Sequence, residues 1–231
     1  MTDITPENHP VGLAGVPLAV EPLKRRDFAS DQEVRWCPGC GDYAILSTFQ
    51  GVLPDLGIAK ENAVVISGIG CSSRFPYYMS TYGMHSIHGR APAIATGVAV
   101  SRPDLAVFVI TGDGEQLMGV GSLATAGAQQ PPNLSVVVLD NGHFGETGMQ
   151  RSHSSLGTRL AQVARACGIE QAAEIHSLDD VEALAGRINA RAGLNFAQVH
   201  VKADELPRAL PSRDGVFVKN RFRQALGFAL L

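Results

Sequence analysis

Apolar runs and helical patterns alternate along the chain, and the clearest example lies between residues 105 and 141. A near-continuous apolar run, Leu105 to Ile110, stops at the turn Thr111-Gly112-Asp113-Gly114, and small residues in a helical pattern follow from about Gln116 to Gln129. A second apolar run, Leu134 to Leu139, ends at Asp140-Asn141. This pattern predicts a βαβ unit with two buried parallel strands.

The alternation continues on both sides of this unit and predicts an α/β fold with a three-layer parallel sheet. Further strands are predicted over Ala63–Ser67, Ala172–Ile175 and Phe196–Val201. Helices are predicted through Ile45, Leu46 and Phe49, and over Pro92–Val100, Thr158–Cys167, Leu178–Ala192 with Ser177 as its cap, and Val218–Leu226. We expect an extended, proline-containing N-terminal arm over residues 1–32 and one domain over residues 33–231.

Composition narrows the class of protein. The net charge is −3 and 45% of the residues are hydrophobic, which disfavours a nucleic-acid-binding surface and a disordered acidic chain. The sequence has no run of eighteen apolar residues and no pattern of a signal peptide, so we expect a soluble cytoplasmic protein without a membrane span. In such a protein the four cysteines favour metal binding or reduced thiols over disulfides.

Candidate chemistry lies where the two strands of the βαβ unit end. Carboxyl ends of neighbouring parallel strands meet at one edge of the sheet, so Asp113 and Asn141 should come close together as two oxygen ligands. The glycine turn beside them exposes backbone N–H groups that can bind an anion. Together these are the parts of a magnesium diphosphate site.

The pair Cys37 and Cys40 forms a CxxC loop before a predicted helix, a position that lowers thiol pKa values and suits metal or redox chemistry. Four interpretations remain open from the residues alone. The pair could be half of a zinc site, a thioredoxin-like dithiol, two ligands of an iron–sulfur cluster, or two reduced structural cysteines.

The spacing of the glycine turn and the distal Asp140-Asn141 pair resembles the GDG…NN motif of thiamine diphosphate enzymes, with Asp140 in place of the first Asn. The resemblance implies the diphosphate-binding domain of that family. It also implies that Asp113, Asn141 and the backbone carbonyl of His143 hold Mg²⁺. Gly112, Gly114 and Glu115 would then lie at the cofactor.

Two long segments resemble the β subunits of 2-oxoacid:ferredoxin oxidoreductases, most like the 2-oxoglutarate type. They are RWCPGCGDYAIL, from Arg35, and the stretch from Gly68 to Ala99. The resemblance implies that Cys37, Cys40 and Cys71 are ligands of an iron–sulfur cluster and that the loop with Gly70, Cys71 and Ser72 faces the cofactor. It also implies that His88 and Arg90 orient the carboxylate of the substrate.

The second half of the chain is different. The segment DNGHFGETGMQRSHS, from Asp140, and the stretch from Pro207 to Leu226 resemble the cofactor subunits of sulfopyruvate and phosphonopyruvate decarboxylases. Thr147 and Gly148 would still contact the diphosphate. The fourth cluster cysteine of the oxidoreductases is missing from the comparable strand AQVHVKADE, which would leave His200 or a partner residue as the fourth ligand. Cys167 is better explained as a buried thiol.

The resemblance implies that the cofactors are thiamine diphosphate and Mg²⁺. The missing fourth cysteine puts the iron–sulfur cluster in doubt. The resemblance also implies an obligate partner chain. Glu33, Glu61 and Glu146 match no motif for the glutamate that activates the cofactor, so an α subunit with the pyrimidine-binding domain should supply it in an α2β2 assembly. We favour the oxidoreductase, which also uses CoA and ferredoxin. The alternatives are a non-oxidative 2-oxoacid decarboxylase subunit and, least favoured, a non-catalytic module in which Cys37 and Cys40 bind zinc.

Overall fold

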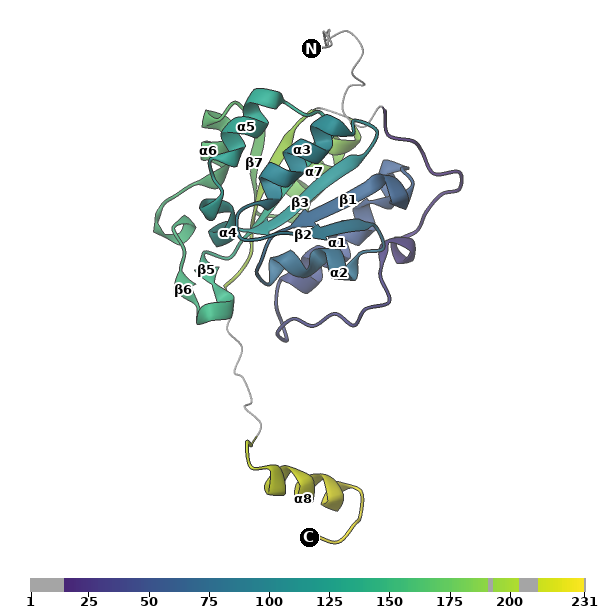
Figure 1. The fold of residues 1–231 in the computed structure, drawn as a ribbon, viewed down its shortest axis with the longest axis vertical. Helices are drawn as coiled ribbons and strands as arrows, with labels where there is room; N and C mark the ends of the chain where they lie inside the picture. Colours follow the sequence, from purple (N-terminus) through teal and green to yellow (C-terminus); the bar gives the residue numbers. More distant parts are fainter. Residues whose placement is uncertain (1–14, 191–192, 204–211, 231) are drawn as a thin grey trace.

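The computed structural model describes residues 15–190, 193–203 and 212–230, and its centre is a six-stranded sheet (Figure 1). The strands lie in the order β2-β1-β3-β4-β8-β7, and every neighbouring pair is parallel. Their bounds are β1 Ala63–Ser67, β2 Tyr82–His85, β3 Ala106–Gly112, β4 Leu134–Asp140, β7 Gln171–Ile175 and β8 Asn195–His200. The predicted α/β fold with a parallel sheet is confirmed.

Helices cover both faces of the sheet and give it three layers. One face packs against α3 (Ala91–Ser101), α5 (Ser122–Gln129) and α6 (Leu160–Ala166). The other face packs against α1 (Asp42–Val52), α2 (Phe75–Tyr78) and α7 (Leu178–Asn189). Strand β3 shows the reason: Val107 and Val109 face the first layer while Phe108 and Ile110 face the second, so both faces must be covered.

Besides six short 3₁₀ helices, the described chain contains α4, α8 and a two-stranded ribbon. Helix α4 (Asp113–Met118) begins directly after β3, and α8 (Gly215–Ala225) contributes no buried residue and lies outside the three layers in Figure 1. A short antiparallel ribbon pairs β5 (His143–Phe144) with β6 (Gln150–Arg151). Among the described helices, none has the length and apolar character that a membrane crossing requires.

Three details differ from the prediction. The turn expected at residues 111–114 is the end of β3 and the start of α4. The helix expected over residues 116–129 is divided into α4 and α5, because the backbone at Gly119 packs directly on Gly89, where a Cβ on Gly119 would lie 1.7 Å from the carbonyl oxygen. Strand β2 was not predicted, and all four of its residues are exposed. An edge strand without an apolar run gives no periodic signal.

The described part of the predicted arm contacts the domain. Val16 and Phe28 are buried, and isolated β-bridges join Leu18 to Ile58 and Ala29 to Met79. The first fourteen residues of that prediction lie outside the described residues. The boundary between arm and domain at residue 32 remains a prediction.

Candidate functional site

The carboxyl ends of β1 and β3 lie side by side, and the chain leaves them in opposite directions. β1 leads to β2 on one side of the sheet, and β3 leads to β4 on the other. Open parallel sheets bind ligands at such a switch point. The glycine-containing loop after β1, the start of α4 directly after β3 and the turn after β4 all reach this edge, so the structure brings together the segments that the sequence selected.

Asp113 is the first residue of α4 and is only 2% exposed. Its Oδ2 atom accepts hydrogen bonds from the hydroxyls of Ser152 and Ser154, the latter at 2.7 Å. Burial raises the pKa of Asp113, the two serine hydroxyls partly oppose this, and the nearby charge of Asp140 raises the pKa further. A cation at this carboxylate would remove the cost of burying its charge.

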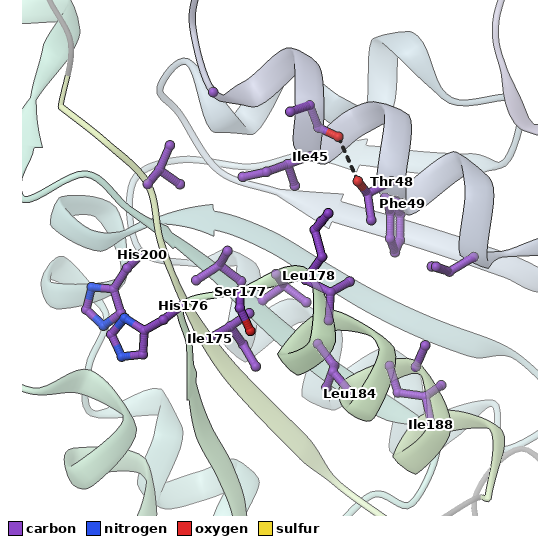
Figure 2. A pocket seen from close by; sticks show the side chains of 18 of the residues that line it. Ile45, Thr48, Phe49, Ile175, His176, Ser177, Leu178, Leu184, Ile188 and His200 are labelled. Carbon is purple, nitrogen blue, oxygen red and sulfur yellow. Dashed lines mark hydrogen bonds between the residues drawn. The ribbon is translucent and has the colours of Figure 1, made fainter.

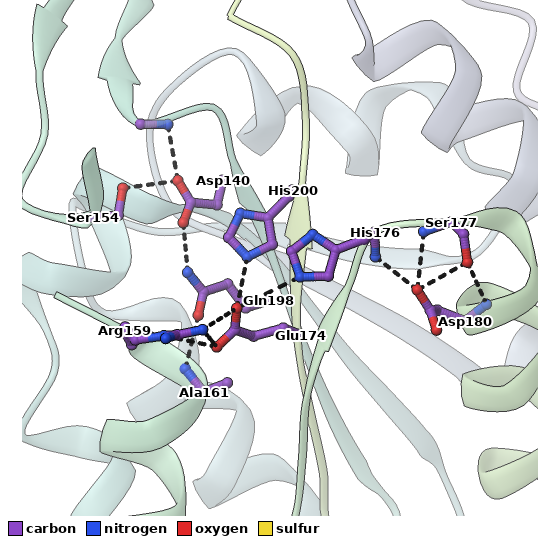
Figure 3. A network of polar contacts seen from close by, with 11 residues as sticks. Asp140, Ser154, Arg159, Ala161, Glu174, His176, Ser177, Asp180, Gln198 and His200 are labelled. Atoms are coloured by element: carbon purple, nitrogen blue, oxygen red, sulfur yellow. Dashed lines mark hydrogen bonds and ion pairs between the residues drawn. The ribbon is translucent and has the colours of Figure 1, made fainter. Parts of the chain in front are cut away.

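Asp140, at the end of β4, is tied to the same hydroxyl. Ser154 Oγ lies 2.8 Å from Asp140 Oδ1, and a hydroxyl carries a single proton, so it cannot donate to Asp113 and Asp140 at once. Asp140 also accepts from the N–H of Gly142 at 2.8 Å and from Gln198 Nε2 at 2.6 Å (Figure 3). Asp140 therefore faces β8 as a structural acceptor, and Asn141 is the next side chain along the chain.

Asn141 and His143 form a tight turn. Asn141 Oδ1 accepts a hydrogen bond from the His143 N–H at 2.9 Å, and His143 Nδ1 lies 2.8 Å from the Asn141 carbonyl oxygen. The register of the sheet pairs Gly112 with Leu139, so Asp113 and Asn141 follow adjacent strand ends. The predicted magnesium ligands thus share one edge of the sheet.

Several buried polar groups near this edge have no protein partner among the described residues. Glu115 Oε2 accepts from Ser73 Oγ at 2.8 Å, but its Oε1 atom is buried without a hydrogen bond. The side chains of Ser67, Thr111 and Gln116 also contain such atoms. Because native proteins leave few buried polar atoms unsatisfied, these groups fit a polar ligand that contacts this edge. This donor and acceptor set is compatible with a diphosphate and its metal ion.

The other residues predicted to bind the cofactor lie around the same edge. Ser72 packs against Gly112, and Phe144 packs against Gly114. Gly70 and Cys71 precede Ser72 in the loop after β1. Thr147 and Gly148 lie in the exposed loop between β5 and β6, where the Thr147 hydroxyl donates to Gln150 Oε1 at 2.7 Å.

His88 and Arg90 are exposed in the loop that joins β2 to α3. Contact between Gly89 and Gly119 holds this loop against the end of α4. The backbone of this loop is therefore fixed beside α4, and both side chains are accessible to a ligand.

The cysteine loops are adjacent. The indole N–H of Trp36 donates to the Cys71 carbonyl oxygen at 2.7 Å and joins the CxxC loop to the loop after β1. Burial is the main reason that the pKa of Cys40 is raised to about 11 and that of Cys71 to about 12. Cys71 Sγ also lies 3.5 Å from Glu146 Oε1. These thiols are protonated near neutral pH, and a metal would have to displace their protons.

His200 does not point toward these cysteines. Its imidazole contacts Glu174 and stacks on His176, as Figure 3 shows. The next residue, Val201, packs against Gly41, which directly follows Cys40. The end of β8 thus meets the CxxC loop through an apolar side chain. Cys167 packs partly against the core beside α6, and Glu33 and Glu61 are exposed.

Sequence reasoning did not identify Ser73, Ser152, Ser154 or Gln198. Ser152 and Ser154 reach Asp113 only because the β5–β6 ribbon turns the chain back, and no periodicity in the sequence indicates that turn. A two-residue ribbon is too short to give a strand signal.

A separate groove of about 470 Å³ lies between α1 and α7 on one face of the sheet (Figure 2). Its lining is mainly apolar, with Ile45, Phe49 and Leu184 among the side chains drawn there. The polar side chains that line it include His176 and His200 at one end, but none of the predicted cofactor or magnesium ligands is among them, so the candidate site remains the switch point.

Comparison with known proteins agrees with this location. The family described as thiamine pyrophosphate enzyme, C-terminal TPP binding domain, matches residues 68–201. A 2-oxoglutarate oxidoreductase subunit KorB of Mycobacterium tuberculosis is 56% identical over 142 residues, which are 62% of this chain and 38% of that protein. A 2-oxoacid:ferredoxin oxidoreductase subunit beta of a Sulfolobus species is 45% identical over 120 residues, or 51% of this chain and 39% of that protein. The chain thus covers about two fifths of the length of these relatives.

Solved structures show the same fold. The 2-oxoglutarate:ferredoxin oxidoreductase from Magnetococcus marinus, with 2-oxoglutarate, coenzyme A and succinyl-CoA bound, matches with a TM-score of 0.69 and 26% identity. That match covers 91% of this chain and 93% of that one. Benzoylformate decarboxylase from Polynucleobacter necessarius matches with a TM-score of 0.56 and 17% identity over 78% of this chain and 36% of that one, a likeness of fold alone.

Proposed function

The chain belongs to the thiamine diphosphate enzymes, whose C-terminal TPP binding domain its residues 68–201 match, and from this premise we propose that it is the cofactor-binding β subunit of a 2-oxoacid:ferredoxin oxidoreductase. The observation that carries the proposal is the grouping of Asp113, Asn141 and the unsatisfied Glu115 at the switch point. The oxidoreductase subunits among its relatives support the reaction class, and their names favour 2-oxoglutarate as substrate. Membership of this family argues against the non-catalytic zinc module.

Each loop at the edge has a role in this proposal. Asp113, the Asn141 side chain and the His143 carbonyl oxygen hold Mg²⁺, an ion that prefers oxygen ligands. The diphosphate is bound by the loop after β1, the junction of β3 and α4, and the loop between β5 and β6, through Gly70, Cys71, Ser72, Gly112, Gly114, Glu115, Thr147 and Gly148. When bound, thiamine diphosphate supplies the electron sink that decarboxylation of a 2-oxo acid requires.

His88 and Arg90 are proposed to bind the substrate. Both are exposed at the edge of the site, and the Arg90 guanidinium can pair with a carboxylate through two parallel hydrogen bonds. Their role is to orient the 2-oxo acid, and His88 also contacts the cofactor.

A partner chain completes the site. The candidate glutamates Glu33 and Glu61 are exposed, and Glu146 is engaged by Cys71 and Arg74. The glutamate that activates thiamine diphosphate therefore comes from an α subunit with a pyrimidine-binding domain, in an α2β2 complex that uses CoA and ferredoxin.

The iron–sulfur cluster is the least supported part of the oxidoreductase. Cys37, Cys40 and Cys71 lie on two adjacent loops, but a cluster of four irons is usually held by four cysteine thiolates. Because His200 turns away and Val201 meets the CxxC loop, a residue of the partner would have to supply the fourth ligand. These contacts favour a second candidate function, the cofactor subunit of a non-oxidative 2-oxoacid decarboxylase.

Products distinguish the two functions. The complex is purified anaerobically with its natural partner chain, and iron, acid-labile sulfide and the products from 2-oxoglutarate are measured. The oxidoreductase predicts about four irons per chain, with CoA-dependent reduction of ferredoxin and formation of succinyl-CoA. Absence of iron together with an aldehyde product that forms without CoA would establish the decarboxylase instead.

A further inference from the structure

Glu174, His176 and His200 form a cluster of three potential metal ligands that shares no ligand with the magnesium and cysteine sites, although His200 lies opposite Asp140 in the sheet (Figure 3). One nitrogen or oxygen atom of each side chain lies within 4.8 Å of the others. His200 Nε2 is 3.3 Å and His176 Nε2 is 3.6 Å from the same atom, Glu174 Oε2. We propose that these three side chains bind one Zn²⁺ ion.

Strand geometry places the three side chains on one face. Glu174 and His176 are two residues apart at the end of β7, so they point to the same side of an extended chain. The register pairs Glu174 with Gln198 and Ile175 with Val199, which brings His200 opposite His176. The cluster therefore follows from the pairing of β7 with β8 and does not depend on a mobile loop.

The distances suit a tetrahedral ion. Zinc bonds to imidazole nitrogen and carboxylate oxygen of about 2.1 Å place neighbouring ligand atoms about 3.4 Å apart in a tetrahedron. The 3.3 Å between His200 Nε2 and Glu174 Oε2 is close to that value, and His176 Nε2, now 3.6 Å from the same oxygen, would take its ligand position when its ring turns. Two imidazoles and one carboxylate leave a fourth position open for water, as in many zinc sites with three protein ligands.

The ligand types favour zinc over magnesium. Imidazole nitrogen binds zinc, copper and nickel, whereas Mg²⁺ takes oxygen ligands. Arg159 holds both oxygens of the carboxylate: its Nε donates to Glu174 Oε1 and its Nη2 to Glu174 Oε2, each at 3.1 Å, and Oε2 is also the oxygen nearest the two histidines. Such partners fix the orientation of a metal-binding carboxylate.

Binding requires one local rearrangement. The two imidazole rings are stacked with their centroids 4.3 Å apart and an angle of 2° between their planes, whereas a metal ion lies in the plane of each ring that binds it. The His176 side chain is 61% exposed and can turn out of the stack without disturbing the core. His200 and Glu174 then keep their positions.

A bound ion would stabilise the edge strand β7 of the sheet. Within the described part of the chain, β7 is the last strand in the order and pairs only with β8, so an ion held by Glu174, His176 and His200 would fasten β7 at its carboxyl end. Ligand binding to the folded state alone stabilises it by mass action. The proposal does not depend on the function of the Asp113 site.

The test uses the full chain after removal of metal with a chelator. Zn²⁺ binding is measured by calorimetry, and Co²⁺ is added as a spectroscopic probe of a tetrahedral site. The variants are His176→Ala, His200→Ala and Glu174→Gln, with His153→Ala as the matched control because His153 is exposed and outside the cluster. The double variant Cys37→Ser/Cys40→Ser removes zinc binding by the CxxC loop.

The proposal predicts one equivalent of Zn²⁺ that remains in His153→Ala and in the double cysteine variant. Affinity should fall at least about tenfold in each of the three cluster variants, since even loss of a supporting residue costs that much at a metal site. The Co²⁺ spectrum should show tetrahedral absorption without a thiolate charge-transfer band. Unchanged affinity in His176→Ala and His200→Ala, or zinc binding that disappears with the two cysteines, would overturn the proposal.

Discussion

The Cys71 thiol donates a hydrogen bond to Glu146, with Sγ 3.5 Å from Oε1. Arg74 Nη2 lies 3.2 Å from the same oxygen. Cys71 belongs to the half of the sequence that resembles the oxidoreductase subunits, and Glu146 belongs to the half that resembles the decarboxylase subunits. The two resemblances therefore meet in one contact, at a thiol that an iron–sulfur cluster would need as a thiolate.

This contact predicts the reactivity of Cys71. Burial is the main cause of its raised pKa of about 12, and the charge of Glu146 adds to it. Glu146→Gln removes that charge, so the thiolate fraction of Cys71 rises and its alkylation at pH 9 becomes several times faster. Rates are measured by peptide mapping after timed exposure to iodoacetamide. The exposed Cys37 is the internal control, and equal Cys71 rates in both proteins would contradict the account.

The close approach of Gly68 to Glu115 predicts opposite effects of the same substitution at two glycines. A Cβ on Gly68 would lie 1.4 Å from Glu115 Oε1, so Gly68→Ala must displace the carboxylate and should lower the free energy of unfolding by about 1–3 kcal/mol. Gly51 lies in α1 with no atom within 4 Å of its Cβ position. Gly51→Ala should raise stability by about 0.5–1 kcal/mol. Urea denaturation measures both, and a Gly68→Ala protein as stable as the wild type would refute the contact.

The raised pKa of Asp42 predicts how the free energy of unfolding of the metal-free chain depends on pH. Burial raises its pKa from 3.8 to about 6, although the Cys40 thiol opposes the shift, so the folded state prefers the protonated carboxyl. The resulting stabilisation is fully present below about pH 4 and is lost as the pH rises through 6. Asp42→Asn keeps a neutral side chain and should be more stable than the wild type by about 2–3 kcal/mol at pH 8, with little difference at pH 4.

Thermal unfolding of the two proteins at both pH values measures the effect. Asp55→Asn, at an exposed carboxylate in the turn after α1, is the matched control and should show no such difference. A wild type that is the more stable protein at pH 8 would show that Asp42 is held as a carboxylate.

The sequence predicted the site residues that directly follow strands with strong apolar runs. Asp113 and Asn141 follow β3 and β4, whose residues are almost all buried, so periodicity located both strand ends within a few residues. Ser152 and Ser154 could not be found in this way, because a two-residue ribbon and its turns bring them back to Asp113. The division of α4 from α5 depends on contact between Gly119 and Gly89, which are thirty residues apart in sequence.

The cysteine prediction shows a different limit. Spacing and resemblance selected Cys37, Cys40 and Cys71, and the structure places their loops side by side through the Trp36 hydrogen bond. The sequence did not show whether the His200 side chain faces those loops, because this depends on which face of β8 the side chain lies on. Its pairing with Glu174 is a contact between strands that no local pattern encodes.

The central claim is that Asp113 binds the magnesium ion of thiamine diphosphate, and the most direct measurement is binding of the cofactor to the complex with its partner chain. Thiamine diphosphate is titrated in the presence of Mg²⁺ into the wild type, Asp113→Asn and the control Asp104→Asn, which changes an exposed carboxylate paired with Arg102. The account predicts that affinity falls at least about tenfold in Asp113→Asn and is unchanged in Asp104→Asn. Equal affinity in all three proteins would contradict it.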